Sequence, residues 1–357
     1  MTDAERALIE KLRSQRSLSL QEYAHLIEAR GEEAAMLLAS CADERRRKVY
    51  GNRVFIRGLI EISNICKNDC LYCGIRRSNI SCERYRLGQD DILSACAEGY
   101  ALGFRTFVLQ GGEDAYFTDD VLCGLVRAIK RNHPECAVTL SMGERSRESY
   151  ALLRAAGADR YLLRHETANP QHYAKLHPAQ MSFENRMRCL HDLKVLGYQV
   201  GCGFMVGSPY QTAQDLAMDL KFIEEFAPHM VGIGPFIPHA ATQFAHEAAG
   251  TVELTCFLLS IIRLMHPAIL LPATTALGSI DPMGREKGIR SGANVVMPNL
   301  SPPGVRSKYA LYNGKRFDGE ESAQGILSLK KRMASIGYEV VTDRGDAACG
   351  QDSIRKA

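Results

Sequence analysis

The sequence has no apolar run that approaches the ~20 residues a membrane-spanning helix requires. Its N-terminal segment, MTDAERALIEKLRSQ, carries Asp3, Glu5 and Glu10 and lacks a long apolar core, which excludes the pattern of a signal peptide or an acid-poor transit peptide. The formal net charge of +3 is too small to indicate binding to nucleic acid or to a membrane surface. We therefore expect a cytoplasmic protein that binds neither.

The chain also lacks internal repeats, low-complexity segments and any Pro/Gly-rich linker long enough to separate two domains. Its 357 residues are 46% hydrophobic and 24% charged, as in a globular protein with a large core. Cysteine, in contrast, is abundant, with 12 residues. In a long chain without a secretion signal this indicates metal binding or redox chemistry rather than a disulfide framework.

Apolar spacing predicts a helical extension over residues 1–50, a barrel over 51–345 and a C-terminal tail over 346–357. Within the barrel region, short apolar runs alternate with longer amphipathic ones. The predicted strands are Val54–Ile62, Thr106–Gln110, Ala137–Leu140, Arg160–Arg164, Val200–Val206, Met230–Gly234, Ile269–Ala273 and Ala293–Met297. Eight strands alternating with helices favour an α/β fold, a (β/α)8 TIM-type barrel with an N-terminal helical extension. An open doubly wound sheet is the alternative.

The segments between these strands have the spacing of amphipathic helices. They are Gln89–Leu102, Val121–Asn132, Ser149–Ala156, Phe183–Leu196, Ala213–Phe226 and Leu254–Met265. Gly103, Gly157 and Gly197 follow three of them and suit a left-handed C-cap, while Thr212 and Asp215 have the spacing of a capping box. Polar and glycine-rich residues follow the predicted strands, which in a β/α barrel is the rim that carries the active site.

The first predicted strand is followed by the segment CKNDCLYC, in which Cys66, Cys70 and Cys73 are candidate metal ligands. Three thiolates can hold three irons of a 4Fe–4S cluster and leave the fourth iron free to chelate S-adenosylmethionine (SAM). A structural zinc site is the alternative, but zinc normally requires four ligands and no second half-site follows. The spacing matches the radical SAM signature, and it predicts a cluster that cleaves SAM reductively.

The remaining cysteines are expected to be buried and to have no catalytic role. They are Cys41, Cys82, Cys96, Cys123, Cys136, Cys189, Cys202 and Cys256, with Cys349 alone near the C-terminus.

Residues 50–315 resemble the FeFe-hydrogenase maturase HydE family, within the radical SAM group that includes biotin synthase and methylornithine synthase. The segments that carry the resemblance are IRGLIEISNICKNDCLYCGIRRSN, VLQGGEDAYF, GADRYLLRHETANP, SFENR, MVGIGPFIPH, PATTALG and GANVVMPN. The resemblance implies a SAM site formed by Gly111, Gly112, Glu113, Ser141, Glu166 and Arg186. The chemistry is suitable, because glycines allow close backbone approach and carboxylate and guanidinium groups pair with polar ligands. A tight turn, surface salt bridges and a turn-capping serine are the alternatives.

The resemblance also implies an inner substrate cavity lined by Arg57, Gln110, Thr139, Arg164, Thr274, Thr275, Met297, Tyr309 and Tyr312. Arg57 and Arg164 lie in or at the end of apolar strands, where an unpaired charge is costly. Since Arg164 lies two residues before Glu166, an extended chain would point both side chains the same way. We expect Arg164 to await an anionic ligand or to pair with Glu61 or Glu166. The alternative for Met297 and the two tyrosines is ordinary core packing.

Some relatives hold an auxiliary cluster through cysteines near the C-terminus, but residues 311–332 contain none, so we predict no auxiliary cluster. The resemblance implies a HydE-type reaction, in which a 5′-deoxyadenosyl radical attacks a cysteine-bound iron carbonyl–cyanide complex. Its implied partners are HydG, which makes that complex, the scaffold HydF, and an electron donor. A mutase of the methylornithine synthase type and a non-catalytic metal-binding scaffold are the alternative functions.

Overall fold

A computed structural model describes residues 1–317 and 319–348 of the chain. The tail predicted over 346–357 lies mostly outside the described residues, as does Cys349. The division into extension, barrel and tail stays a prediction. No helix within the described ranges combines the length and apolarity needed to cross a bilayer.

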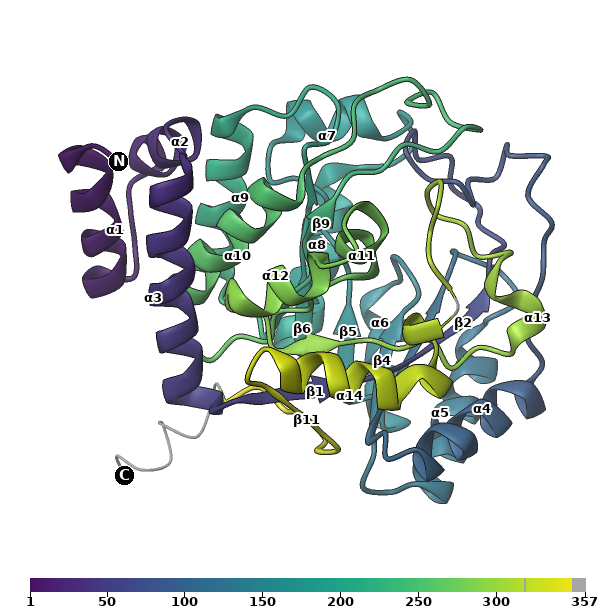
Figure 1. Cartoon of the computed structure of the whole chain (residues 1–357). Coiled ribbons are helices and arrows are strands. Elements are labelled where there is room, and N and C mark those ends of the chain that lie inside the picture. Colours follow the sequence, from purple (N-terminus) through teal and green to yellow (C-terminus); the bar gives the residue numbers. More distant parts are fainter. Residues whose placement is uncertain (318, 349–357) are drawn as a thin grey trace.

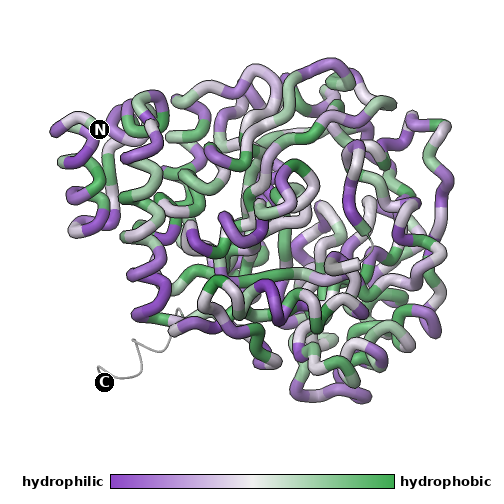
Figure 2. Tube along the Cα trace, in the orientation of Figure 1, coloured by the Kyte–Doolittle hydropathy of each residue, from purple (hydrophilic) through white to green (hydrophobic). Residues whose placement is uncertain are grey.

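Three helices precede the first strand: α1 (Asp3–Gln15), α2 (Leu20–Glu28) and α3 (Glu32–Tyr50). Thr2 and Ser19 start the first two through capping boxes with glutamates three residues later. The chain trace alternates between hydrophilic and hydrophobic along these helices, because each buries only one face (Figure 2). They lie side by side at one edge of the molecule, with α3 against α10 and α2 against α9 (Figure 1).

The largest sheet has six parallel strands in the order β2-β3-β4-β5-β6-β8. Its strands are β2 (Gly58–Ser63), β3 (Thr106–Gly111), β4 (Ala137–Ser141), β5 (Arg160–Leu162), β6 (Gln199–Cys202) and β8 (Met230–Val231). In its register Glu61 pairs with Gln110, and Gln110 pairs with Ser141. The carboxyl ends of β2, β3 and β4 therefore meet at one edge, which brings the segments that follow them together.

Two smaller parallel sheets complete the strand structure of the described residues. One has the order β10-β1-β11 and the other pairs β7 with β9. Their strands are β1 (Arg53–Ile56), β10 (Val295–Val296), β11 (Glu339–Val341), β7 (Met205–Val206) and β9 (Gly234–Pro235). Isolated parallel bridges join Met230 to Leu270, Pro272 to Val295 and Leu59 to Asn299. The predicted α/β class with parallel strands is confirmed, whereas the regular ladders form separate sheets.

Several predicted strand boundaries are wrong. The run Ile269–Ala273 forms single bridges rather than a strand, and Val54–Ile62 is divided at Arg57 into β1 and β2. Val200–Val206 is interrupted at Gly203, which has φ +155°, and a Cβ there would lie 2.0 Å from the carbonyl oxygen of Gly232. Only glycine fits such a backbone approach, so the ladder stops there.

The helices that follow the strands are α4 (Gln89–Ala101), α5 (Asp119–Asn132), α6 (Arg147–Ala155), α7 (Pro170–Leu176), α8 (Phe183–Val195), α9 (Ala213–Phe226), α10 (Val252–Met265), α11 (Thr275–Ile280), α12 (Gly284–Arg290), α13 (Pro303–Arg306) and α14 (Ile326–Ser335). Six of them, α4, α5, α6, α8, α9 and α10, agree closely with the sequence prediction, whereas α7, α11, α12, α13 and α14 are not among the predicted helices. The predicted left-handed glycines after three helices are confirmed, with φ between +78° at Gly197 and +112° at Gly157. The capping box of Thr212 and Asp215 is also confirmed.

Candidate active site

The CKNDCLYC segment follows β2 as an irregular loop at the carboxyl edge of the main sheet. Three distant segments hold its backbone. The N–H of Lys67 donates to Glu113 O at 3.0 Å, that of Leu71 to Leu176 O at 3.0 Å, and that of Gly74 to Leu311 O at 2.8 Å. The conformation of the cysteine loop is therefore set by the last residue of α7 and by the segments that follow β3 and α13.

Arg84 stabilises the same loop through its carbonyl groups. Its guanidinium donates to the carbonyl oxygens of Asn64 at 2.6 Å, Ile75 at 2.8 Å and Arg76 at 2.5 Å. A loop without regular structure leaves such carbonyls without partners, and one planar guanidinium satisfies several of them. The sequence analysis missed this role, since nothing in the local pattern separates Arg84 from a surface arginine.

The environment of the three cysteines disfavours free thiolates and favours thiolates bound to metal. Burial raises the pKa of Cys66, raises that of Cys73 to about 12, and raises that of Cys70 well above its usual value. Thiolates in this site therefore require added positive charge, which the irons of a cluster supply. The backbone N–H of Glu113 donates to Cys66 Sγ at 3.4 Å, a kind of contact that stabilises a cluster thiolate.

The zinc alternative has less support from the arrangement of side chains. Within the described parts of the chain, no group of three His, Cys, Asp or Glu residues converges as the ligands of a single ion do. A cube of iron and sulfide places its three ligated irons at separate corners, so its thiolates need not converge on one point. All described cysteines are free thiols. Of those expected to be buried, Cys82 and Cys256 are only partly so.

The glycine-rich segment after β3 lies directly against the cysteine loop. A Cβ on Gly112 would be 2.3 Å from Ile65 O and 2.8 Å from Cys66 Cβ, so only glycine fits there. Glu113 forms an ion pair with Lys67 at 3.0 Å and accepts a hydrogen bond from the N–H of Glu144 at 3.1 Å. The segment is thus more than a tight turn, because it determines how closely β3 approaches the cysteines.

Asp114, the next residue, forms a polar cluster with Arg86 and Ser63. Its carboxylate accepts two hydrogen bonds from Arg86, at 2.7 and 2.8 Å, and one from Ser63 at 2.7 Å. Burial alone would raise the pKa of Asp114, but these hydrogen bonds outweigh it and hold the pKa below the ordinary aspartate value of about 3.9. The carboxylate therefore stabilises the fold above that pH, and the contribution disappears as the pH falls through the lower folded pKa.

We expect Asp114→Asn to lower the free energy of unfolding by about 1.5 kcal/mol at pH 7. This value allows for solvent screening of the partly exposed Arg86. Urea denaturation between pH 3 and pH 7 measures the difference, which should shrink towards pH 3. A difference that stays constant across this range would contradict the assignment.

Glu166, Arg164 and Arg186 come together beside the cysteine loop. Glu166 and Arg186 are 8% and 6% exposed, so the surface salt-bridge alternative is wrong for both. Arg186 Nε donates to Glu144 at 2.5 Å, and Arg186 Nη1 donates to Arg164 O at 2.6 Å. Arg164 Nη2 lies 3.2 Å from Glu166 Oε2, so the expected pairing with Glu166 is present.

The expectation that an extended chain points the side chains of Arg164 and Glu166 the same way is wrong. β5 ends at Leu162, and Glu166 has φ +68°, so the chain is not extended between Arg164 and Glu166. The N–H of Glu166 donates to Gly203 O at 3.0 Å. A non-glycine residue in the left-handed region is strained, and such strain persists only where neighbouring contacts hold it, often at ligand sites.

His165 and Asp219 stabilise this strained segment through hydrogen bonds from the backbone around it. His165 Nδ1 accepts from the N–H of Gly203 at 3.3 Å, so its proton lies on Nε2, which donates to Asp219 Oδ1 at 3.2 Å. Asp219 Oδ1 also accepts from the N–H of Ala168 at 2.6 Å. Burial lowers the pKa of His165 to about 3, which keeps the ring neutral. The sequence analysis missed both residues because their spacing along the chain gives no sign of contact.

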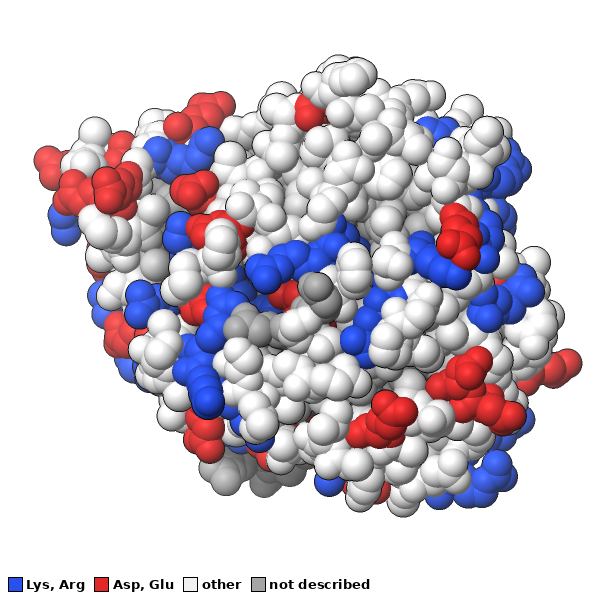
Figure 3. Space-filling view, turned by 45° about the vertical axis from the view of Figure 1, so that its right-hand side comes forward, with Lys and Arg blue, Asp and Glu red and all other residues white. Residues whose placement is uncertain are grey.

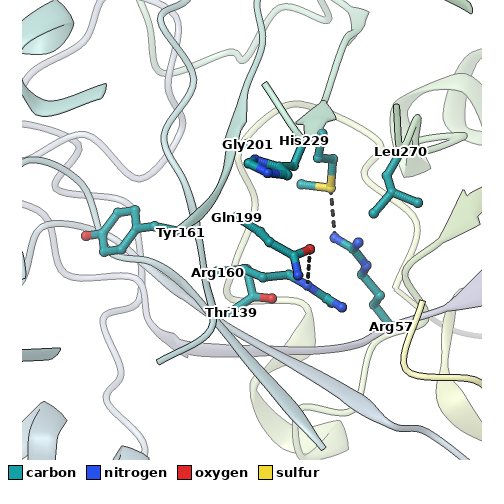
Figure 4. Close-up of a pocket in the computed structure, with 9 residues that line it drawn as sticks. Arg57, Thr139, Arg160, Tyr161, Gln199, Gly201, His229 and Leu270 are labelled. Carbon is teal, nitrogen blue, oxygen red and sulfur yellow. Dashed lines mark hydrogen bonds between the residues drawn. The ribbon is translucent and has the colours of Figure 1, made fainter. Parts of the chain in front are cut away.

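The remaining predicted residues fall into two groups, and the first lies deep in the fold. Arg57 and Thr139 line a cavity of about 10 Å³ with Arg160 (Figure 4), which is room for about one water. Arg57 donates to Met230 Sδ at 2.8 Å and to Gly345 O at 3.4 Å, and its Nε has no partner. Burial and the neighbouring Arg160 lower the pKa of Arg57. In this state of the protein the two residues are not in a space large enough for a substrate.

The second group lies nearer the cysteine loop. Gln110 Nε2 donates to Tyr309 Oη at 3.4 Å, and Thr275 Oγ1 donates to Glu321 at 3.0 Å. The hydroxyl of Thr274 is buried without a partner. Ser141 ends β4, and among the described residues its hydroxyl makes no hydrogen bond, so it does not cap a turn.

Met297 is partly buried and packs against an apolar cluster that includes Phe55, Leu162 and Met230, and its place in the substrate cavity stays a prediction. Tyr312, Tyr309 and Lys315 line an open pocket of about 220 Å³ together with His239.

Lys315 is a site residue that the sequence analysis did not find. Its ammonium group pairs with the fully buried carboxylate of Glu61 and donates to Tyr309 O at 2.8 Å. Asn299 Nδ2 donates to the other oxygen of Glu61 at 2.8 Å. The expected alternative, in which Glu61 pairs with Arg164, is therefore wrong. Lys315 lies in a polar loop remote in sequence from β2, and only the fold brings them together.

The chain is similar to known proteins over most of its length. Residues 60–223 match the model of the radical SAM superfamily. The chain is 46% identical over 341 residues to the FeFe-hydrogenase maturase subunit HydE of Thermotoga maritima, covering 95% of this chain and 97% of the relative. It is 29% identical over 326 residues to the 3-methylornithine synthase of Methanosarcina acetivorans, covering 90% of each. Among solved structures, methylornithine synthase (PylB) superposes with a TM-score of 0.82 at 27% identity, covering 94% of this chain and 97% of that one.

Membership of the radical SAM superfamily implies a 4Fe–4S cluster and SAM, the cofactors that the three-cysteine loop predicts. The HydE relative exceeds the methylornithine synthases both in identity and in coverage. The chain is a radical SAM enzyme, and it belongs to the FeFe-hydrogenase maturase HydE family.

Proposed function

We propose that this enzyme acts in the assembly of the di-iron subcluster of FeFe-hydrogenase, with Cys66, Cys70 and Cys73 as the ligands of its 4Fe–4S cluster. The observation that carries the proposal is the contact between the cysteine loop and the Gly112–Glu113 segment, beside the group of Glu166 and Arg186, in a chain similar to HydE over nearly its whole length. When bound, the cluster and SAM supply a 5′-deoxyadenosyl radical.

The SAM-facing roles are divided among residues at or just after the ends of β3 and β4, in the segment after β5 and in α8. Gly111 and Gly112 allow the backbone after β3 to approach the ligand, and Glu113 lies beside the loop to accept from an ammonium group. Glu166 is a carboxylate acceptor for ribose hydroxyls or the ammonium, Arg186 is a cation for the methionine carboxylate, and Ser141 has a free hydroxyl in the same region. The ion pairs of Glu113 with Lys67 and of Arg186 with Glu144 fix these side chains before SAM binds.

The substrate is proposed to be an anionic iron carbonyl–cyanide complex that carries cysteine and is made by HydG. Arg164 and Lys315 are cations beside the site whose present partners, Glu166 and Glu61, are carboxylates that a competing anion can displace. Lys and Arg side chains also gather across the middle of one face of the molecule (Figure 3), which would attract an anion. Gln110, Thr274, Thr275, Tyr309 and Tyr312 supply hydrogen-bonding groups, and Met297 stays a candidate for lining the same cavity. Arg57 and Thr139 lie against a space with room for about one water, so no substrate contact is proposed for these two.

The same proposal includes the finer features of fold and assembly. The proposed fold is a TIM-type barrel, which is supported by the parallel strand order and by the isolated bridges between the sheets. The absence of cysteine from residues 311–332 supports a single cluster without an auxiliary one. HydF is the proposed recipient of the product, and a separate electron donor reduces the cluster.

The test supplies the anaerobically reconstituted protein with SAM, reductant and the product of HydG. We expect adducts between 5′-deoxyadenosine and cysteine sulfur by mass spectrometry, and new iron species by electron paramagnetic resonance (EPR). SAM cleavage without either product would contradict the substrate assignment while leaving the radical SAM assignment intact.

A methylornithine synthase-type mutase is the second candidate, favoured by the PylB superposition. It predicts that incubation with an amino acid isomeric with 3-methylornithine, together with SAM and reductant, yields 3-methylornithine. Formation of that product would exclude the maturase proposal in its present form. A non-catalytic scaffold is already incompatible with the radical SAM enzyme assignment.

A further inference from the structure

Tyr173 of α7 has a buried hydroxyl that no described residue satisfies. The residue is 1% exposed, and its Oη makes no hydrogen bond. Leaving a buried hydroxyl without a partner carries a free-energy cost, so such groups in native proteins call for an explanation. A phenylalanine would fill the same space without that cost.

The ring of Tyr173 is held firmly in place. It stacks on His177 with centroids 3.9 Å apart and an interplanar angle of 22°, and it meets Phe183 edge-on at 5.6 Å. His177 Nδ1 donates to the carbonyl oxygen of Tyr173 at 3.0 Å, so His177 Nε2 is the acceptor for the hydroxyl of Tyr72, at 3.1 Å. Tyr173 is therefore coupled to the cysteine loop through a histidine of defined tautomer.

The hydroxyl belongs to the environment of the proposed SAM site. The guanidinium of Arg186 lies 6.0 Å from the ring centroid of Tyr173. Burial, in the first place, raises the pKa of Tyr173, and the charges that act on its hydroxyl are those of Arg186, Glu144, Cys70 and Glu166. Cys70 belongs to the cysteine loop, and Arg186, Glu144 and Glu166 are the charged residues described beside it.

The Nη2 group of Arg186 remains available to a ligand. Its Nε and Nη1 are taken by Glu144 and by the carbonyl of Arg164, whereas Nη2 makes no hydrogen bond to any described residue. Arg186 Nη2 and the hydroxyl of Tyr173, whose ring centroid lies 6.0 Å from the guanidinium, therefore offer two kinds of donor to one carboxylate.

We propose that the Tyr173 hydroxyl donates a hydrogen bond to the methionine carboxylate of SAM, together with Arg186 Nη2. The hydroxyl is then satisfied only when SAM is bound, which explains why this position carries tyrosine. The inference depends on the radical SAM assignment and not on the identity of the maturase substrate.

The test compares wild-type protein with Tyr173→Phe, both anaerobically reconstituted. SAM is titrated against the reduced cluster, and its dissociation constant is read from the change in the EPR signal. We expect the variant to bind SAM about tenfold more weakly, as for loss of a hydrogen bond to a charged group. Without SAM, its Tm should equal or exceed that of the wild type, because an unsatisfied hydroxyl has been removed. Tyr210→Phe, whose side chain is exposed, is the matched control and should behave as wild type.

A second ligand separates direct contact from an indirect packing effect. With decarboxylated SAM, the tenfold difference between wild type and Tyr173→Phe should disappear, since the group that the hydroxyl contacts is absent. Equal SAM affinity of the two proteins would overturn the proposal, and so would an equal loss of affinity for both ligands. A wild-type protein whose cluster signal does not respond to SAM would instead contradict the cofactor-site assignment itself.

Discussion

Replacing any one of Cys66, Cys70 or Cys73 by alanine is expected to lower the rate of SAM cleavage by a factor on the order of 10³ or more, the scale seen when a member of a catalytic unit is removed. The three thiols act as a unit, because a cluster bound at two corners is exposed to loss of iron and cannot present one defined open iron. Iron content and the EPR spectrum of the reduced protein measure cluster retention, and 5′-deoxyadenosine formation measures cleavage.

The control for this experiment is Cys82→Ala. Cys82 is a half-buried thiol close to the cysteine loop, where it contacts Asn64 Nδ2 at 3.5 Å, but the proposal gives it no iron. That variant should keep the cluster and most of its SAM cleavage. Unimpaired SAM cleavage in any one of the three alanine variants would exclude the cluster assignment.

Helix boundaries and the cysteine loop can be predicted from the sequence, because both depend on residues that are close together in the chain. Helix boundaries follow from periodicity and capping, as for α9, whose predicted limits coincide with the observed ones. The cysteine loop is recognisable because its three ligands lie within eight residues. In contrast, the run Ile269–Ala273 has a strand-like composition, yet it makes only isolated bridges, since pairing depends on the neighbouring strands and not on the run itself.

The residues that sequence analysis missed act over long separations. Lys315 reaches Glu61 from 254 positions along the chain, and Asp219 reaches His165 from 54 positions. Buried ion pairs and hydrogen bonds of this kind have no periodic signature. They become visible only when the fold places one polar side chain against another in the interior.

Gly112 leaves no room for a side chain beside the cysteine loop. An added methyl group would overlap Ile65 O and Cys66 Cβ, at 2.3 and 2.8 Å. Neither contact can be relieved by the far end of a flexible side chain, because both involve the backbone or the Cβ of the cysteine loop. Gly112→Ala therefore has to displace the loop, and such overpacking costs about 1–3 kcal/mol of stability.

We expect Gly112→Ala to lower SAM cleavage about 10²-fold, the effect of misplacing reacting groups by about 1 Å. The chain offers a matched control in Gly124, an exposed position within α5 where a Cβ would meet no atom within 4 Å. Gly124→Ala should raise stability by about 0.5–1 kcal/mol, since alanine is the better helix former, and leave cleavage unchanged. Urea denaturation and 5′-deoxyadenosine formation, measured on both variants, separate the two effects. Wild-type cleavage in Gly112→Ala would mean that the segment after β3 does not determine the position of the cysteine loop, because a loop displaced by the methyl group would no longer hold its thiols where SAM is cleaved.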